Sequence, residues 1–287
     1  MTRLWILASL LVPHLAGAQK IEQGRPLAAD GSLKIFAYTG SIRVVGWDRD
    51  SIAVRGSYAG GAHRFHMGGS RNAVKMYVED DAPRTLESHL EIRVPTNAKV
   101  WVKTESASID VRDVSGSVDL NSITGAIRVS GTMRDLYAEA MDADIELTAT
   151  APALRAKTAS GTITLTGGGD NVRLTTVSGA LRVRADGLER SRFETVTGDI
   201  SFTGDLSRGT SSAFESHSGR VELTLPRTVS ADFDVSTFGG PIENRLTKTR
   251  PKTSEKGRTR TLAFSAGDGG AEVQVRNFKG PVIIRAQ

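Results

Sequence analysis

A nine-residue period of apolar positions runs through the middle of the chain. Every ninth residue from Ile109 to Leu181 is aliphatic, and the residue two places later, from Val111 to Val183, is apolar at every step. All eighteen positions are apolar, whereas composition alone would make about seven of them apolar. The residues between the two columns are mostly charged or polar. This alternation predicts strands of about five residues, buried on one face and joined by turns of about four.

Two such halves form a repeat of 18 residues. Segments resembling KTASGTITL begin at Lys103, Asn121, Glu139, Lys157 and Thr175, and the series continues at steps of 19, 21 and 21 from Glu194, Glu215 and Ser236. Equivalent residues stack only if the chain winds in one direction, because a meander of hairpins reverses at every strand. We therefore predict an all-β fold, a single-stranded, two-layer β-solenoid (β-helix-like) with coils of about 18–21 residues and irregular capping ends.

Small and hydroxyl residues recur where the strands are expected to turn. Glycines that predict corners with a permissive backbone are Gly116, Gly125, Gly161, Gly179, Gly198 and Gly219. Hydroxyl residues that predict hydrogen bonds to turn amides are Thr104, Ser122, Thr158, Thr176, Thr195, Ser216 and Thr237. With only 16 aromatic residues in the chain, we expect a thin interior of aliphatic side chains.

The departures from the period divide the chain. We predict a signal peptide at 1–18, an N-terminal cap with the first coils at 19–102, regular repeats at 103–243, a basic loop at 244–260 and C-terminal closing strands at 261–287. Residues 19–287 are expected to form one structural domain, because an open coil exposes pairing edges that the ends must cover. Within the cap, the Gly-rich segment Ala59–Arg71 predicts an exposed loop.

The N-terminus is typical of an exported protein. Arg3 precedes the mostly apolar run Leu4–Leu15, and Ala16-Gly17-Ala18 has the small-x-small pattern of a signal-peptidase site, which predicts cleavage after Ala18. The run is too short to span a bilayer, and no later stretch is long enough. The mature chain is therefore expected to be extracytoplasmic, periplasmic or secreted, without a transmembrane segment. The absence of cysteine excludes a lipoprotein anchor, disulfides, a thiolate metal site and a cysteine nucleophile.

Candidate catalytic and metal-binding groups are few. Paired carboxylates on one solenoid face would suit polysaccharide cleavage, and the candidates are Asp110, Asp113, Asp119, Asp142, Asp144 and Glu146. Asp110, Asp119, Asp144 and Glu146 are predicted to point outward, where they could cluster, but the outward columns hold almost no aromatic platforms for sugar rings. His63 and His66 have a spacing that suits a metal ligand pair, yet a solvated loop fits them better. We expect no cofactor.

One concentration of charge lies near the C-terminal end. The stretch from Glu243 to Arg260 has a net charge of +5, equal to that of the whole chain. Its cations are Arg245, Lys248, Arg250, Lys252, Lys256, Arg258 and Arg260. The simpler interpretation is an excursion that its charge keeps soluble; the functional one is a contact for an anionic envelope polymer, a lipid surface or an envelope protein. Export and the lack of interleaved aromatic residues argue against nucleic acid.

Several landmarks together resemble a known family. They are Trp47-Asp48-Arg49-Asp50, Val94-Pro95 before the repeats, the T-x-S-G-x-I coils and the closing Asn277-Phe278-x-Gly280-Pro281-Val282. The chain resembles the exported bacterial β-strand-repeat proteins called toast-rack domains, which carry the label of candidate adhesins. This resemblance implies a solenoid-like envelope domain without assigned catalytic residues. We expect a non-enzymatic adhesin-like scaffold or binding module; the alternatives are a carbohydrate-active enzyme and an envelope-stress sensor.

Overall fold

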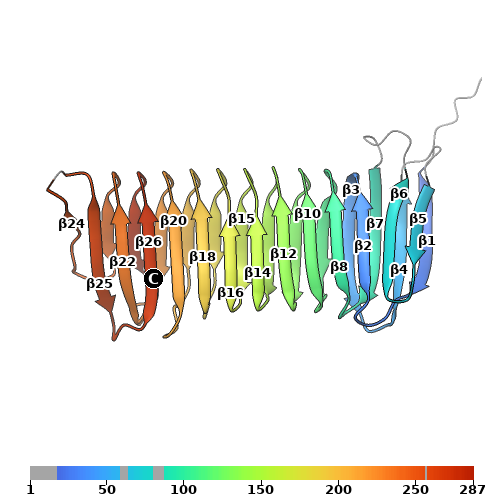
Figure 1. Cartoon of the computed structure of the whole chain (residues 1–287), viewed down its shortest axis with the longest axis horizontal. Helices are drawn as coiled ribbons and strands as arrows, with labels where there is room; N and C mark the ends of the chain where they lie inside the picture. Colours follow the sequence, from blue (N-terminus) through green and yellow to red (C-terminus); the bar gives the residue numbers. More distant parts are fainter. Residues whose placement is uncertain (1–17, 59–63, 80–86, 256) are drawn as a thin grey trace, which may run out of the picture.

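The structure, a computed structural model, describes residues 18–58, 64–79, 87–255 and 257–287. Within these residues the fold is all-β, with 27 strands in two sheets and no helix (Figure 1). The thirteen-stranded sheet contains, in spatial order, β1 (Gln19–Pro26), β4 (Ser51–Tyr58), β7 (Glu87–Pro95), β3 (Thr39–Trp47), β9 (Ser108–Arg112), β11 (Ile127–Thr132), β13 (Ile145–Thr150), β15 (Ile163–Gly168), β17 (Leu181–Arg184), β19 (Ile200–Thr203), β21 (Val221–Leu225), β27 (Val282–Ala286) and β23 (Ile242–Arg245). The fourteen-stranded sheet contains β24 (Lys252–Thr253), β25 (Arg260–Ala266), β22 (Ala231–Thr237), β26 (Ala271–Asn277), β20 (Ser211–Ser216), β18 (Arg190–Thr195), β16 (Asn171–Thr175), β14 (Ala153–Lys157), β12 (Asp135–Ala140), β10 (Ser117–Ser122), β8 (Lys99–Thr104), β2 (Ser32–Ala37), β6 (Ala73–Glu79) and β5 (Arg64–Gly69).

The predicted solenoid is confirmed by the strand register. Each regular coil gives one strand to each sheet, and neighbouring coils pair in parallel. In the middle of the stack the offset is 18 residues, so that Ile127 lies beside Ile145 and Ile145 beside Ile163. In the other sheet Val118 pairs with Leu136 at the same offset. Equivalent residues of successive repeats therefore form continuous ladders along the stack.

The two apolar columns make the core. All eighteen of their side chains are at most 4% exposed. Aromatic side chains also enter the interior, contrary to the sequence-based expectation: Phe193, Phe202 and Phe214 are fully buried and in mutual ring contact at 5.1–6.1 Å. They lie in the coils where the repeat lengthens to 19 and 21 residues, and there the core accommodates the larger rings.

The hydroxyl column works as predicted at the turns. The amide of Gly198 donates to Thr195 Oγ1 at 3.0 Å, and the same bond, from a glycine to the hydroxyl three residues earlier, recurs in four other coils. The glycines are required for a different reason from the expected one. They do not have a left-handed backbone; a Cβ on Gly198 would lie 1.7 Å from the carbonyl oxygen of Gly179 in the next coil. The corners of successive coils are in backbone contact, which leaves no space for a side chain.

Chain order and stacking order differ at both ends. The coil β26–β27, last in the sequence, lies between β20–β21 and β22–β23 (Figure 1). Likewise β2–β3, the first coil, is enclosed between β6–β7 and β8–β9. The segment Gly280-Pro281-Val282, which resembles the repeat, is thus part of an internal coil.

Antiparallel strands cover the two ends. At the N-terminal end, β4 pairs with β1 and β7, and β5 pairs with β6. The predicted loop Ala59–Arg71 is therefore wrong in part, because β5 lies inside it as an edge hairpin; residues 59–63 lie outside the described part. At the other end, β25 pairs with β22 and with the short β24. None of the described segments is a helix that could span a membrane, and the predicted signal peptide falls almost wholly outside the described residues.

Candidate binding surfaces

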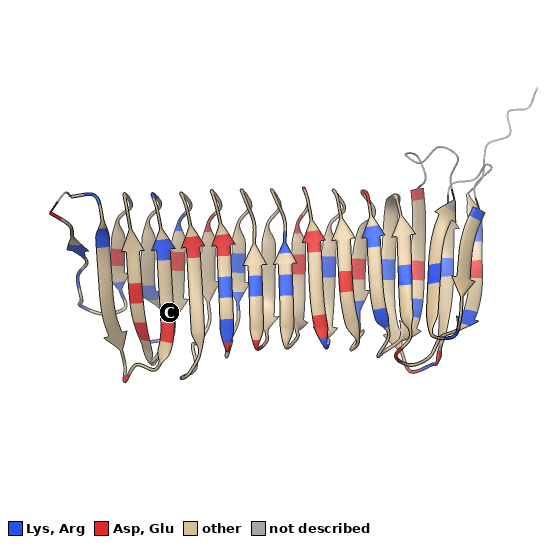
Figure 2. Ribbon diagram, in the orientation of Figure 1, with Lys and Arg blue, Asp and Glu red and all other residues tan. Residues whose placement is uncertain are grey.

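The basic segment predicted from the sequence lies at the C-terminal end of the stack, around β24 (Figures 1 and 2). Two of its cations have local structural contacts: Arg245 pairs with Glu243 at 2.5 Å, and Arg260 donates to the carbonyl oxygen of Gly240 at 2.9 Å. Four others are exposed and form no ion pair with the described residues, namely Lys248, Arg250, Lys252 and Arg258. Lys256 lies outside the described part. This segment remains a predicted contact for an anionic partner.

The structure separates the outward carboxylates. Asp110 on β9 and Asp119 on β10 lie in different sheets, on opposite faces of the solenoid, so these two do not form the cluster that the sequence left open. Alternate coil halves belong to alternate sheets, and for this reason a nine-residue offset changes the face. Asp110 is paired with Arg43 at 3.4 Å and Arg112 at 2.8 Å.

The remaining candidate carboxylates have structural partners or lie at a turn. Glu146 pairs with Arg128 at 3.3 Å. Asp142 accepts a hydrogen bond from Ser160 Oγ, and Asp144 from the amide of Thr162, both at 2.8 Å. Asp113 follows β9 with a φ of 56°.

The histidine pair is resolved only in part. His66 on β5 stacks on Tyr77 with ring centroids 5.1 Å apart, and His63 lies outside the described residues. Within the described segments no group of three or more His, Cys, Asp or Glu side chains is arranged to hold a metal ion.

A surface that the sequence reasoning missed follows one long edge of the solenoid. From the coil of Ser122 onward, the residue after the hydroxyl column projects from the turn; in two coils Ala140 and Asn277 occupy the hydroxyl column. Stacking brings these projecting residues into one row, which we call the edge ladder: Ile123, Met141, Ala159, Val177, Val196, His217, Phe278 and Phe238. Six of the eight are large apolar side chains that are 40–57% exposed. Because the residue type at this position varies from coil to coil, the repeat pattern did not single it out. The feature that could have revealed it is that apolar residues recur at a turn, where polar residues are usual.

Backbone contacts keep the edge ladder in register. The amide of Val177 donates to Ala159 O and that of Val196 to Val177 O, both at 3.1 Å. Toward the C-terminal end the rings of His217, Phe278 and Phe238 stack face to face, with centroid separations of 4.7 and 4.9 Å. Eight coils at the usual strand spacing give a row about 34 Å long.

A shallow groove accompanies the edge ladder. Three depressions of about 420, 470 and 650 Å³ follow one another along it and share residues where they meet, Ile123 between the first two and Val177 between the last two. Their other wall is the outer column of the fourteen-stranded sheet. This column contains charged residues of both signs, and Lys157 pairs with Glu139 at 3.1 Å. The groove is thus apolar on one side and mixed in charge on the other.

A second overlooked surface lies on the outer face of the same sheet. Trp101 on β8 and Tyr137 on β12 flank Asp119 on β10 in one row of the ladder. They line a depression of about 740 Å³, and burial raises the pKa of the Asp119 carboxyl above its usual value. Trp101 also contacts Phe36 on β2, with ring centroids 4.9 Å apart. The expectation that outward columns hold almost no aromatic platforms is therefore wrong for this part of the sheet.

The comparison with protein families agrees with the coil geometry. Residues 17–285 match the family model described as Toastrack DUF4097. The chain belongs to this family. The Toastrack assignment confirms the resemblance noted in the sequence, and the β-solenoid is the fold that accompanies it here.

Two solved structures are similar to this Toastrack chain. A candidate cell adhesion protein from Clostridium sporogenes is 8% identical, with a TM-score of 0.24, covering 94% of this chain and 100% of that one. A candidate adhesin from Bacteroides fragilis is 10% identical, with a TM-score of 0.41, covering 95% of this chain and 99% of that one. No curated protein matches the chain.

Proposed function

We propose that this Toastrack chain is an exported, envelope-associated and non-enzymatic β-solenoid, an adhesin-like module that contacts an envelope component along the edge ladder. The observation that carries the proposal is the edge ladder itself, a row in which six of the eight side chains are large, apolar and exposed, beside a groove. Soluble monomers expose isolated apolar residues routinely, but a contiguous apolar stripe marks an interaction surface. The stacked coils hold the row straight, so that little conformational entropy is lost on binding.

The distribution of carboxylates supports a binding role over the enzymatic alternative. Cleavage of a glycosidic bond needs two carboxyl groups on either side of the bond. Asp110 and Asp119 lie on opposite faces. Asp110 and Glu146 share a face, but each is paired with arginine. An active glycosidase would be revealed by product release from a panel of envelope and plant polysaccharides, and such turnover would contradict this part of the proposal.

Export is tested on the intact chain. We expect the protein in the extracytoplasmic fraction, with Gln19 as the first residue of the mature form. Replacing both small residues of the cleavage motif, Ala16→Leu together with Ala18→Leu, should leave the precursor uncleaved. Recovery of the wild-type protein in the cytoplasmic fraction, with residues 1–18 still attached, would refute the export proposal.

The binding role is tested by co-sedimentation of the mature protein with washed envelopes. The double variant Val177→Ser, Val196→Ser removes apolar surface from the edge ladder without touching the core, so binding should fall while the melting temperature is kept. Ile283→Ser is the matched control, because Ile283 is an outward apolar residue of β27 in the other sheet. Equal retention of the double variant and the control would refute a role for the edge ladder.

Three further binding experiments identify the class of partner. The same variants are tested for binding to anionic envelope polymers, to vesicles containing anionic lipid, and to purified envelope proteins. A chain with the cations of the basic segment replaced by Gln separates that surface from the edge ladder. Loss of binding in this chain alone would move the contact to the basic segment and contradict the proposed site.

A further inference from the structure

The outer face of β8, β10 and β12 carries rings at a regular spacing. Trp101 and Tyr137 occupy equivalent positions two strands apart, with Asp119 between them in the same row. Two strand spacings are about 10 Å, close to the length of two sugar units in an extended glycan. Both rings are half-buried and line one depression, so each is fixed in place and still reaches solvent. Rings arranged in this way suit the apolar C–H faces of alternate pyranoses along the glycan.

Hydrogen-bonding groups surround the rings. The Asp119 carboxylate, held by Asn121 Nδ2 at 2.7 Å, and the exposed Asp135 can accept from sugar hydroxyls. The indole N–H of Trp101 has no acceptor among the described residues, so a donor is available as well. The depression therefore offers both aromatic faces for the C–H groups of a sugar and hydrogen-bonding groups for its hydroxyls.

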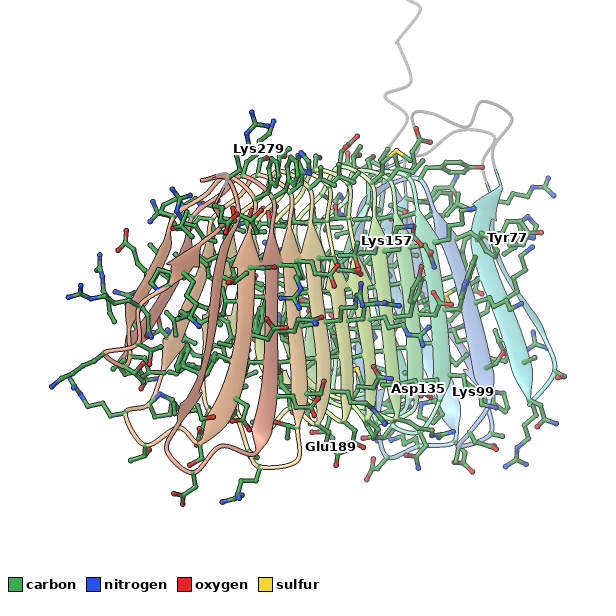
Figure 3. All side chains as sticks on the ribbon, turned by 60° about the vertical axis from the view of Figure 1, so that its left-hand side comes forward. Tyr77, Lys99, Asp135, Lys157, Glu189 and Lys279 are labelled. Atoms are coloured by element: carbon green, nitrogen blue, oxygen red, sulfur yellow. The ribbon has the colours of Figure 1, made fainter. Side chains whose placement is uncertain are left out.

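The charge of the same depression favours an acidic ligand. Lys34, Lys99 and Arg155 line it and form no ion pair with any described residue, whereas its acids are Asp119 and Asp135. Figure 3 shows Lys99 and Asp135 toward the same end of their strands, away from Tyr77 and Lys157. Glu139 does not add to the acids of the depression, because it is hydrogen-bonded to Tyr137 and paired with Lys157 at 3.1 Å. Three cations thus line the depression against two carboxylates.

We propose that the face formed by β8, β10 and β12 binds an extended acidic polysaccharide, with sugar rings stacked on Trp101 and Tyr137 and the ligand's carboxylates paired with Lys99 and Arg155. The inference rests on the proposed function, since it names a ligand class for an extracytoplasmic binding module. A peptide that adds a strand has no place here, because β8, β10 and β12 are each paired on both sides.

The test uses the mature protein and oligogalacturonate of about six units as the probe, with the methyl-esterified oligomer as a neutral match. Titration calorimetry should detect binding of the acidic oligomer, and binding of the methyl ester should be much weaker. Trp101→Thr and Tyr137→Thr should each weaken binding by about tenfold, whereas Tyr137→Phe, which keeps the ring, should change it by less than about threefold.

The charge contribution has its own matched pair. Arg155→Gln should weaken binding of the acidic oligomer, whereas Arg182→Gln should not; Arg182 is an exposed residue of β17 in the other sheet and forms no ion pair with any described residue. The charge variants and Tyr137→Phe should melt at the wild-type temperature. Trp101→Thr and Tyr137→Thr lose half-buried rings and should melt slightly lower while staying folded at the assay temperature.

The results separate the two proposals. No binding of either oligomer, equal binding of both, or unchanged binding in Trp101→Thr and Tyr137→Thr would overturn the polysaccharide site. Envelope retention that still depends on Val177 and Val196 would then leave the proposed function intact. Cleavage of the oligomer would instead contradict the proposal that the protein is not an enzyme.

Discussion

The corner glycines make a strong prediction because the available space is known. In Gly198→Ala the new methyl group would lie 1.7 Å from the carbonyl oxygen of Gly179, whereas ordinary contacts begin near 3.4 Å. The two corners must therefore separate by more than an ångström. Two inter-coil hydrogen bonds beside the glycine oppose this movement, from Thr197 N to Val177 O at 2.9 Å and from Leu181 N to Asp199 O at 2.8 Å.

The cost follows from these contacts. Overpacking against a fixed backbone costs about 1–3 kcal/mol, and two weakened hydrogen bonds add about 1 kcal/mol each. We expect Gly198→Ala to lower the free energy of unfolding by about 3–5 kcal/mol. The control is Gly68→Ala on β5, where no atom lies within 4 Å of the new methyl group and φ is not positive. It should change stability by less than about 1 kcal/mol.

Urea unfolding of the mature chain measures both variants, and hydrogen exchange locates the effect. Because each coil contacts only its neighbours, the loss should appear as faster exchange of the Leu181 and Gly198 amides and fade within a few coils. A Gly198→Ala protein as stable as Gly68→Ala would refute the argument that backbone contact between coils requires glycine.

Three other perturbations test the stack. Thr195→Val leaves a buried turn amide without its acceptor and should cost about 1–3 kcal/mol in urea unfolding, whereas the exposed Thr166→Val should be close to neutral. Phe214→Ala opens the aromatic part of the core and should cost about 3–5 kcal/mol; a smaller loss would mean that the coils collapse onto the space. The bidentate hydrogen bond from Arg276 lowers the pKa of Asp234, so this pair's contribution is present above the unfolded-state pKa of about 3.9 and is lost as the pH falls through the lower folded-state pKa. Because the pair is exposed, the loss should stay below about 1 kcal/mol, and Asp234→Asn should abolish it in acid titrations of stability.

The binding surfaces were predictable only in fragments. The basic segment is visible in the sequence because its cations are neighbours along the chain. The edge ladder is not, since its members are 18 or more residues apart and each looks like a variable turn residue. Trp101, Asp119 and Tyr137 likewise become neighbours only when three coils stack. Asp110 and Asp119 are the converse case: one repeat half apart in the sequence, they are separated by the whole thickness of the molecule.

The sequence by itself determined the coil. Burial of apolar area is the dominant favourable contribution to folding. Alternating apolar residues with a nine-residue period are therefore all buried when the chain winds so that equivalent positions stack. The order of the coils was decided by the tertiary structure. A coil such as β26–β27 can pair with any neighbour of the same register, so its place between β20–β21 and β22–β23 depends on which edges the whole chain leaves open. The local sequence pattern determines the register between paired strands. Which coils become neighbours depends on long-range strand pairing, and this pairing also determines which residues meet on the surface.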